Sequence, residues 1–257
     1  MTTAHSGSGD PRRSLELLWR GREPAGRGPR PGLSLERIVG AAVELADREG
    51  IAAVSMRKVA AELGVGTMSL YHYVPGKGEL LDLMLDYVVE VPQAPKGKRR
   101  QTWREVLETM AWRTWRLYLS HPWLLQVNQA RPVVGPKAFA ALESVVAGLD
   151  GLSLTGQEKM AAIAAVENYV TGAARTYLMR QEASQRSTMT EEDFWALQAP
   201  YLSEAMADGA CPHLAALPED SFQLVPEDAF EFGLQALLDG LAATIERRKS
   251  APRRKTG

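Results

Sequence analysis

Residues 55–77 read SMRKVAAELGVGTMSLYHYVPGK, and this stretch predicts two short helices joined by a tight turn. The first helix begins at Ser55, whose hydroxyl can accept a backbone N–H of the first turn, and it carries apolar residues at helical spacing. Gly64 supplies a residue that can adopt a positive φ where this helix ends. The second helix, residues 67–73, ends before Pro75, which has no N–H to donate to a helix.

The second helix of this pair is expected to bury one face and expose the other. At 3.6 residues per turn, Leu70 and Val74 lie on one side, and Met68 and His72 lie on the opposite side. The major groove of B-DNA, about 12 Å wide, admits such a helix, and its hydroxyl, imidazole and thioether groups suit base edges and thymine methyls. We therefore predict that residues 67–73 bind DNA in a sequence-specific manner. The alternative is an ordinary helical hairpin whose tyrosines belong to the core and whose histidine is only solvated.

Basic side chains on either side of this helix are placed to contact phosphate. Arg57 lies at the start of the first helix, and Lys77 lies at the start of the following helix, whose free N–H groups favour an anion. The whole chain has a net charge of only −1, but its basic residues gather in the first 30 residues, between Arg57 and Lys77, and after residue 245. An acidic body with a small basic surface concentrates DNA binding at that surface and makes it depend on salt.

The remaining composition is that of an ordinary globular protein. A chain of 257 residues can form a large core and two domains. Its single cysteine, Cys211, excludes an internal disulfide framework, and the first residues lack the basic-then-apolar run of a secretion signal. The longest uncharged run, residues 117–130, is too short to span a bilayer. We therefore expect a cytoplasmic protein that does not bind membranes.

Composition divides the chain into four parts. The first is rich in Gly, Pro and Arg and is expected to be flexible, apart from a turn of helix within SLELLWRG. The second contains the helix-turn-helix, with a bracing helix before it and a linking helix, residues 77–91, after it. The predicted parts are residues 1–33, a flexible basic arm; 34–91, the DNA-binding domain with its linking helix; 92–248, a regulatory and dimerisation domain; and 249–257, a basic disordered tail.

From residue 102 onward nearly every segment has the pattern of a helix. Thr102 with Glu105, and Thr155 with Glu158, form capping boxes in which two side chains satisfy free backbone donors. Because no segment shows the alternation of a strand, we predict an all-α fold with an N-terminal three-helix domain and a larger C-terminal helical domain. The expected C-terminal helices are residues 102–119, 122–130, 136–149, 155–184, 190–207 and 226–248.

Two of these helices are candidates for a dimer interface. Residues 155–184 carry small side chains that permit close packing, and residues 226–248 carry an apolar stripe. Together they could form a four-helix interface across a twofold axis, although packing within one subunit is equally compatible with the pattern.

The motifs quoted above resemble those of a known family. The stretch SMRKVAAELGVGTMSLYHYVPGK, preceded by LSLERIVGAAVELADREG and followed by GELLDLM, resembles the DNA-binding domain of TetR-type transcriptional repressors. Further along, TWREVL, LSHPW and Arg131-Pro132 follow the order and approximate spacing of the tetracycline-repressor class of C-terminal domain. The resemblance covers residues 33–248 and implies a homodimer that binds a palindromic operator, with C-terminal helices that enclose an inducer pocket.

The resemblance also implies specific contacts. Dimer contacts would come chiefly from residues 155–184 and 226–248. Where the tetracycline repressor offers a histidine to the drug-bound magnesium, this chain has Asn128, which argues against tetracycline with its metal as the ligand. We expect neither a metal site nor a cofactor. The DNA contacts of the family fall on Arg57, Thr67, Met68, Ser69, Tyr71, His72, Tyr73 and Lys77.

Aromatic and methionine side chains gather in the C-terminal half and predict a cavity for a flat apolar ligand, with Asn128 or Thr114 available to fix its orientation. The alternative for each of these residues is ordinary core packing. The candidate ligand-binding residues are Met110, Thr114, Trp115, Trp123, Asn128 and Tyr169.

No catalytic site is predicted. The four histidines are not paired at the spacing of helical metal ligands, and the chain has neither a phosphate-binding glycine loop nor a nucleophile elbow. We therefore predict a sequence-specific DNA-binding regulator, a repressor released from its operator by a small apolar or aromatic ligand, and not an enzyme. The alternative is a DNA-binding dimer whose C-terminal half is a protein-interaction module with no small-molecule ligand.

Overall fold

The computed structural model describes residues 4–21, 33–92, 101–207, 209–218, 221 and 225–250. Within these ranges the ordered elements are helices, and the only β pairing is one isolated bridge between His5 and Asn128. The predicted all-α fold is therefore confirmed. None of the helices in the described ranges has the length and apolar character needed to cross a bilayer. Residues 22–32 of the expected arm and 251–257 of the expected tail lie outside the described residues.

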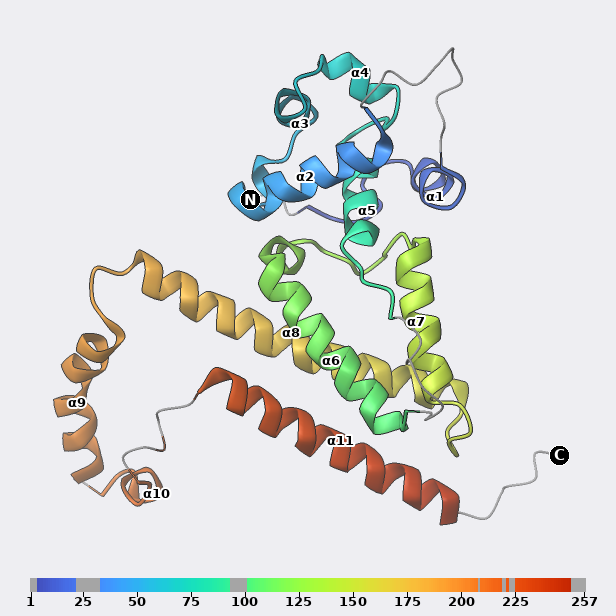
Figure 1. Ribbon diagram of the computed structural model, residues 1–257. Helices are drawn as coiled ribbons and strands as arrows, with labels where there is room; N and C mark the ends of the chain where they lie inside the picture. The colour runs from blue at the N-terminus through green and yellow to red at the C-terminus, as the bar shows by residue number, and fades with distance from the viewer. Residues whose placement is uncertain are drawn as a thin grey trace.

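The N-terminal half is built around the helix-turn-helix (Figure 1). Ser34 and Ser55 cap the first two of its helices by accepting the backbone N–H of Arg37 and of Lys58. Gly64, with φ of +65°, makes the turn between α3 and α4. The elements of this half are α2 (Leu35–Glu49), η1 (Ile51–Ala53), α3 (Met56–Glu62), α4 (Thr67–Tyr71) and α5 (Lys77–Tyr87).

The C-terminal half packs long helices across one another (Figure 1). Both predicted capping boxes, at Thr102 and at Thr155, are present. The core of this half gathers side chains from α6, α7, α8 and α11, with Trp115 and Phe230 among the largest. In Figure 1, α9 and α10 lie at the far end of α8, away from the rest of the helices. The elements are α6 (Trp103–Ser120), η2 (Pro122–Gln126), α7 (Pro136–Gly148), α8 (Gly156–Arg186), α9 (Glu191–Ala207), α10 (Pro212–Ala215) and α11 (Pro226–Ser250).

Residues 4–21 contain a helix that is longer than the single turn expected within SLELLWRG. This segment, which we call the N-terminal strap, contains α1 (Pro11–Arg20), and α1 packs against α5 with Leu17 buried. Asp10 caps α1 by accepting the N–H of Arg12, and Pro11 occupies the first helical position. Asp10 followed by Pro11 is a local signal of a helix start, although the segment that follows α1 is rich in Gly and Arg.

Several helix boundaries also differ from the prediction. The segment 122–130 forms only a 3₁₀ helix to Gln126, because Asn128 then pairs its backbone with the strap, donating its N–H to Ala4 and accepting that of Ser6. The helix α4 ends at Tyr71 instead of residue 73, although the N–H groups of the next turn still donate to the carbonyl of Leu70. The linking helix α5 ends at Tyr87 instead of residue 91.

Candidate nucleic-acid interface and ligand cavity

The helix α4 presents a mixed polar and thioether face to solvent. Met68 is 71% exposed, and Tyr71 and His72 are exposed beside it. On the opposite side, Leu70 and Val74 are completely buried in the core of the N-terminal half. The division into faces that the sequence predicts is therefore present, and the exposed face is free of the protein's own core.

Of the other residues predicted to contact DNA, four are at least partly exposed and one, Tyr73, packs against the core. Thr67 and Ser69 are half-buried on α4, and Arg57 and Lys77 are exposed at the first turns of α3 and α5. Tyr73 instead packs against the core, and its hydroxyl donates to the carbonyl of Leu33 at 3.2 Å. The structure therefore places Tyr73 as an anchor between the end of the hairpin and the start of α2.

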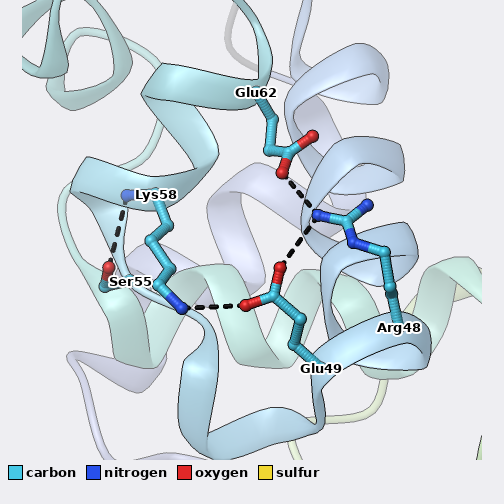
Figure 2. A network of polar contacts seen from close by, with 5 residues as sticks. All are labelled: Arg48, Glu49, Ser55, Lys58 and Glu62. Atoms are coloured by element: carbon cyan, nitrogen blue, oxygen red, sulfur yellow. Dashed lines mark hydrogen bonds and ion pairs between the residues drawn. The ribbon is translucent and has the colours of Figure 1, made fainter.

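A network of charged side chains fixes α3 against the end of α2 (Figure 2). Lys58 donates to Glu49 at 2.9 Å, Arg48 donates to the same carboxylate at 3.1 Å, and Arg48 also bonds to Glu62. Hydrogen bonds from Lys58 and Arg48 hold the pKa of Glu49 below its usual value, and Glu49 and Glu62 raise the pKa of Arg48. Lys58 and Arg48 are thus committed to ion pairs within the protein.

Arg57 and Lys77 differ from that pair, since neither has an ion-pair partner in the described part of the chain. An exposed cation without an internal partner can bind a phosphate, because no ion pair within the protein has to break first. Arg57 and Lys77 lie at the first turns of α3 and α5, the helices that precede and follow α4 in the chain.

Asp82 on α5 holds the N-terminal strap. This carboxylate is completely buried, and it accepts the hydroxyl of Ser6 at 2.8 Å, the N–H of Gly7 at 2.9 Å and the hydroxyl of Ser14 at 2.7 Å. One turn earlier, Glu79 accepts the N–H of Asp10 at 2.8 Å. The strap approaches α5 so closely that a Cβ on Gly78 would lie 2.4 Å from the backbone nitrogen of Gly9. A charge buried in this way is stable only because each oxygen accepts a hydrogen bond.

The strap also reaches the C-terminal half. The hydroxyl of Ser6 accepts the N–H of Val133 at 3.0 Å, in addition to its bond with Asp82. The indole of Trp19 donates to the carbonyl of Val134 at 3.0 Å and meets the ring of Phe139 edge-on. The strap therefore contacts α5 on one side and the segment leading into α7 on the other.

Asp86 ties the far end of α5 to α7. Its carboxylate accepts the N–H of Ala138 at 2.9 Å and that of Lys137 at 3.3 Å, both in the first turn of α7. A carboxylate at a helix N-terminus satisfies free donors and complements the helix dipole. Gly135 permits the approach, because a Cβ there would lie 2.3 Å from the carboxyl carbon of Asp86. These bonds therefore join the first turn of α7 directly to α5.

A cavity of about 790 Å³ lies where the end of α5 meets α6, α7 and α8. Val88, Val89 and Glu90, which directly follow α5, form part of its wall. The lining mixes polar and apolar side chains, and its polar and charged members include Glu90, Arg113, Thr114, Arg116, Tyr118 and Glu167. The apolar side chains of the wall include Val106, Met110, Leu117, Leu142, Val145 and Ile163.

His121 joins this cavity to the N-terminal half. It is a wall residue, and its Nδ1 lies 2.8 Å from Oδ1 of Asp47 on α2. The same oxygen accepts the indole N–H of Trp123 at 2.8 Å. A group bound beside His121 would therefore lie one side chain away from α2.

Two of the six predicted ligand residues, Met110 and Thr114, lie on the wall of this cavity. Asn128 does not, since its backbone pairs with the strap and its side chain accepts the N–H of Ala130. Trp123 is buried in the core of the N-terminal half, where it donates to Asp47.

Trp115 and Tyr169 also belong to core packing and not to the wall. Trp115 stacks on Phe230 with ring centroids 4.4 Å apart, and the hydroxyl of Tyr169 donates to the carbonyl of Phe230 at 2.8 Å. Large aromatic residues at helical spacing usually fill cores, and Trp115 and Tyr169 lie in such packing. The wall residues Tyr118, His121 and Glu167 were not predicted. Of these, only Glu167 had a local signal, as a lone acid after the apolar run AAIAAV.

The described residues show no cluster of three or more His, Cys, Asp or Glu side chains that could hold a metal ion. The two candidate regions are the exposed face of α4 and a partly polar cavity at the end of α5.

Comparison with known proteins agrees with this arrangement. Residues 38–84 match the family model described as bacterial regulatory proteins, tetR family, and residues 94–245 match the model described as tetracyclin repressor-like, C-terminal domain. The HTH-type transcriptional repressor DrrR1 of Streptomyces coeruleorubidus is 51% identical over 255 residues, which cover 98% of this chain and 93% of that protein. An HTH-type transcriptional regulator of Saccharopolyspora erythraea is 36% identical over 84% of this chain and 87% of its own length.

Among solved structures, ActR of Streptomyces coelicolor in complex with actinorhodin has a TM-score of 0.56 and 29% sequence identity. The match covers 85% of this chain and 99% of that one. The likeness therefore extends over both halves of the molecule.

Proposed function

Because the chain belongs to the TetR family of bacterial transcriptional regulators, we propose that it is a repressor that binds a palindromic operator as a homodimer and leaves it when a small ligand fills the cavity. Members of this family are DNA-binding transcription factors and not enzymes. The observation that carries the proposal is α4, which exposes Met68 and His72 while Leu70 and Val74 anchor it from behind.

The operator can be identified by selecting duplexes from a random-sequence pool with the full chain. On the selected duplex, His72→Ala removes a side chain placed to contact bases, and the affinity should fall about 5- to 150-fold. Arg57→Ala should weaken binding to all duplexes alike and reduce the slope of log affinity against log salt by about 1. Arg186→Ala, at the exposed end of α8, is the matched control and should bind normally. Unchanged affinity in both α3 and α4 variants would contradict the proposed interface.

The dimer is proposed to form through α8 and α11. Both helices expose large apolar side chains, with Phe232 79% and Met179 63% exposed. Exposed apolar groups of this size mark interaction surfaces, and a second copy would cover them. Phe232→Glu should shift sedimentation towards the monomer and abolish binding to the palindrome, whereas Phe139→Glu, on α7, should not dissociate the dimer.

Release is proposed to work through α5. A ligand in the cavity contacts Val88 to Glu90 directly, and it can also displace α7, which is bonded to Asp86. Movement of α5 changes the separation of the two α4 helices in the dimer from the spacing of one DNA turn, about 34 Å. Differential binding of a few kcal/mol between the two shapes is enough for such a switch. The complex of ActR with actinorhodin supports a ligand-responsive function for this chain.

A second candidate function is supported by α9, which exposes Trp195, Leu197 and Tyr201. In this alternative the C-terminal half binds another protein and has no small-molecule ligand. A titration of tryptophan fluorescence with a panel of aromatic and apolar compounds separates the two. Saturable quenching that also releases the operator supports the ligand-responsive repressor, and its complete absence supports the protein-interaction module.

A further inference from the structure

We propose that Glu167 makes the cavity selective for ligands that carry a positively charged group, such as a protonated amine, on an apolar or aromatic body. This inference rests on the proposed ligand-responsive function and specifies the chemistry that the cavity recognises.

Glu167 lies on the face of α8 that packs against α6. One turn before it, Ile163 is buried in the core and also forms part of the cavity wall. One turn after it, the hydroxyl of Thr171 lies 3.2 Å from that of Tyr118 on α6. Between these two points Glu167 forms part of the cavity wall, and its side chain is exposed there.

The described residues provide no hydrogen-bond donor and no cation for this carboxylate. Burial by the surrounding wall raises the pKa of Glu167, and no neighbouring charge contributes to that shift. A carboxylate that loses water without gaining a donor destabilises its ionised form, and a bound cation removes that penalty. The acids of α5 do not have this property, since each already accepts bonds from the protein.

The rest of the wall agrees with a cation on an apolar body. Arg113 is occupied by Glu90, donating to its carbonyl oxygen and approaching its carboxylate at 3.9 Å. Arg116 also lines the cavity, but it contributes nothing to the electrostatics of Glu167. The valine, leucine, isoleucine and methionine side chains of the wall offer a surface for rings, and the hydroxyls of Thr114 and Tyr118 can orient polar substituents. An apolar body with one protonated amine can contact the apolar wall, the hydroxyls of Thr114 and Tyr118, and Glu167.

The test compares two flat three-ring probes of similar shape, 9-aminoacridine, which is protonated at neutral pH, and acridone, which is neutral. Both are titrated by fluorescence into the full chain without DNA. The wild type should bind 9-aminoacridine about tenfold or more tightly than acridone, because a hydrogen bond to a charged group contributes that much. Glu167→Gln should lose this preference while retaining acridone. Glu143→Gln, an exposed acid on α7 outside the wall, should retain it.

Equal affinity of the wild type for the two probes, or an undiminished preference in Glu167→Gln, would overturn the inference, as would a failure of both probes to saturate. Operator binding by Glu167→Gln in the absence of probe is measured in parallel and should equal that of the wild type. Loss of the charge preference with intact operator binding thus isolates the cavity chemistry. A chain that binds no operator in any form would instead refute the proposed repressor.

Discussion

Asp82 on α5 and Glu167 on α8 are both carboxylates, but Asp82 is buried in the core whereas Glu167 is exposed at the wall of a cavity. Asp82 is completely buried and accepts three hydrogen bonds of 2.7–2.9 Å from the N-terminal strap. Glu167 lines a cavity, and none of the described residues donates to it. The comparison teaches that an acid whose donors come from its own chain maintains the fold, whereas one without such donors is available to a partner.

Substitution of Asp82, whose oxygens all accept hydrogen bonds, should have the largest effect on the free energy of unfolding. Asp82→Ala leaves two hydroxyls and one N–H without their acceptor in a buried site, and the free energy of unfolding should fall by about 3 kcal/mol. Chemical denaturation followed by circular dichroism measures this change. Asp10→Ala removes only the exposed cap of α1 and should cost about 1 kcal/mol. If the two variants lost equal stability, the strap would not be held chiefly by Asp82.

Substitution of Asp86, at the other end of α5, should have an intermediate effect on the free energy of unfolding. Asp86→Ala deprives the first turn of α7 of its acceptor, and a loss of about 1 to 2 kcal/mol is expected. Hydrogen exchange should accelerate at the N–H groups of Lys137 and Ala138, which donate to Asp86, and remain unchanged in α11. Equal acceleration in both helices would show that Asp86 acts on global stability instead of on the α5 to α7 connection.

The exposed ion-pair network of Figure 2 should contribute less to the stability of the protein, and this contribution should depend on pH. Lys58 and Arg48 lower the pKa of Glu49, so the stability that this carboxylate adds is present above its ordinary pKa and is lost as pH falls through the lowered value. Thermal melts of Glu49→Gln and wild type should therefore differ slightly at neutral pH and converge in acid or in high salt. A difference that persists in acid would show that packing, and not charge, accounts for it.

The smallest loss of stability is expected for substitution of Glu167, which accepts no hydrogen bond from the described residues. Glu167→Gln removes no hydrogen bond from within the described chain, and it should fold with undiminished stability. Because the pKa of Glu167 is raised in the folded state, its stabilising contribution is present at low pH and is lost as pH rises through that raised value. The stability of Glu167→Gln relative to wild type should therefore rise as pH increases. Thermal melts across the acidic range measure this, and a variant that loses stability at every pH would place Glu167 with the structural acids.

The sequence predicted the parts of the fold that depend on neighbours along the chain. Ser55, Gly64 and Pro75 set the limits of the helix-turn-helix, and the faces of α4 followed from helical spacing. The strap could not be found in this way. Its bonds join residues about 70 positions apart, such as Ser14 and Asp82, and local composition carries no trace of such a pairing.

The cavity was predicted least well for a related reason. Aromatic content indicated where large side chains lie, but Trp115 and Trp123 are used to fill the two cores. The sequence marks Glu167 as a lone acid after an apolar run, but only the placement of α6, α7 and α8 shows that it lines a cavity. Periodicity assigns a side chain to a face of its helix, and it does not say whether that face meets packed atoms or an open space.

The N-terminal strap also determines how the molecule comes apart. It is bonded to α5 through Asp82 and to the segment before α7 through Ser6 and Trp19, so the two halves share one structural member. A fragment cut off after residue 92 would retain the helix-turn-helix, but Ser6 would lose the N–H donor of Val133 and Trp19 would lose the carbonyl acceptor of Val134. We therefore expect the DNA-binding and regulatory halves to unfold as a single cooperative unit, and not as two autonomous domains joined by a linker.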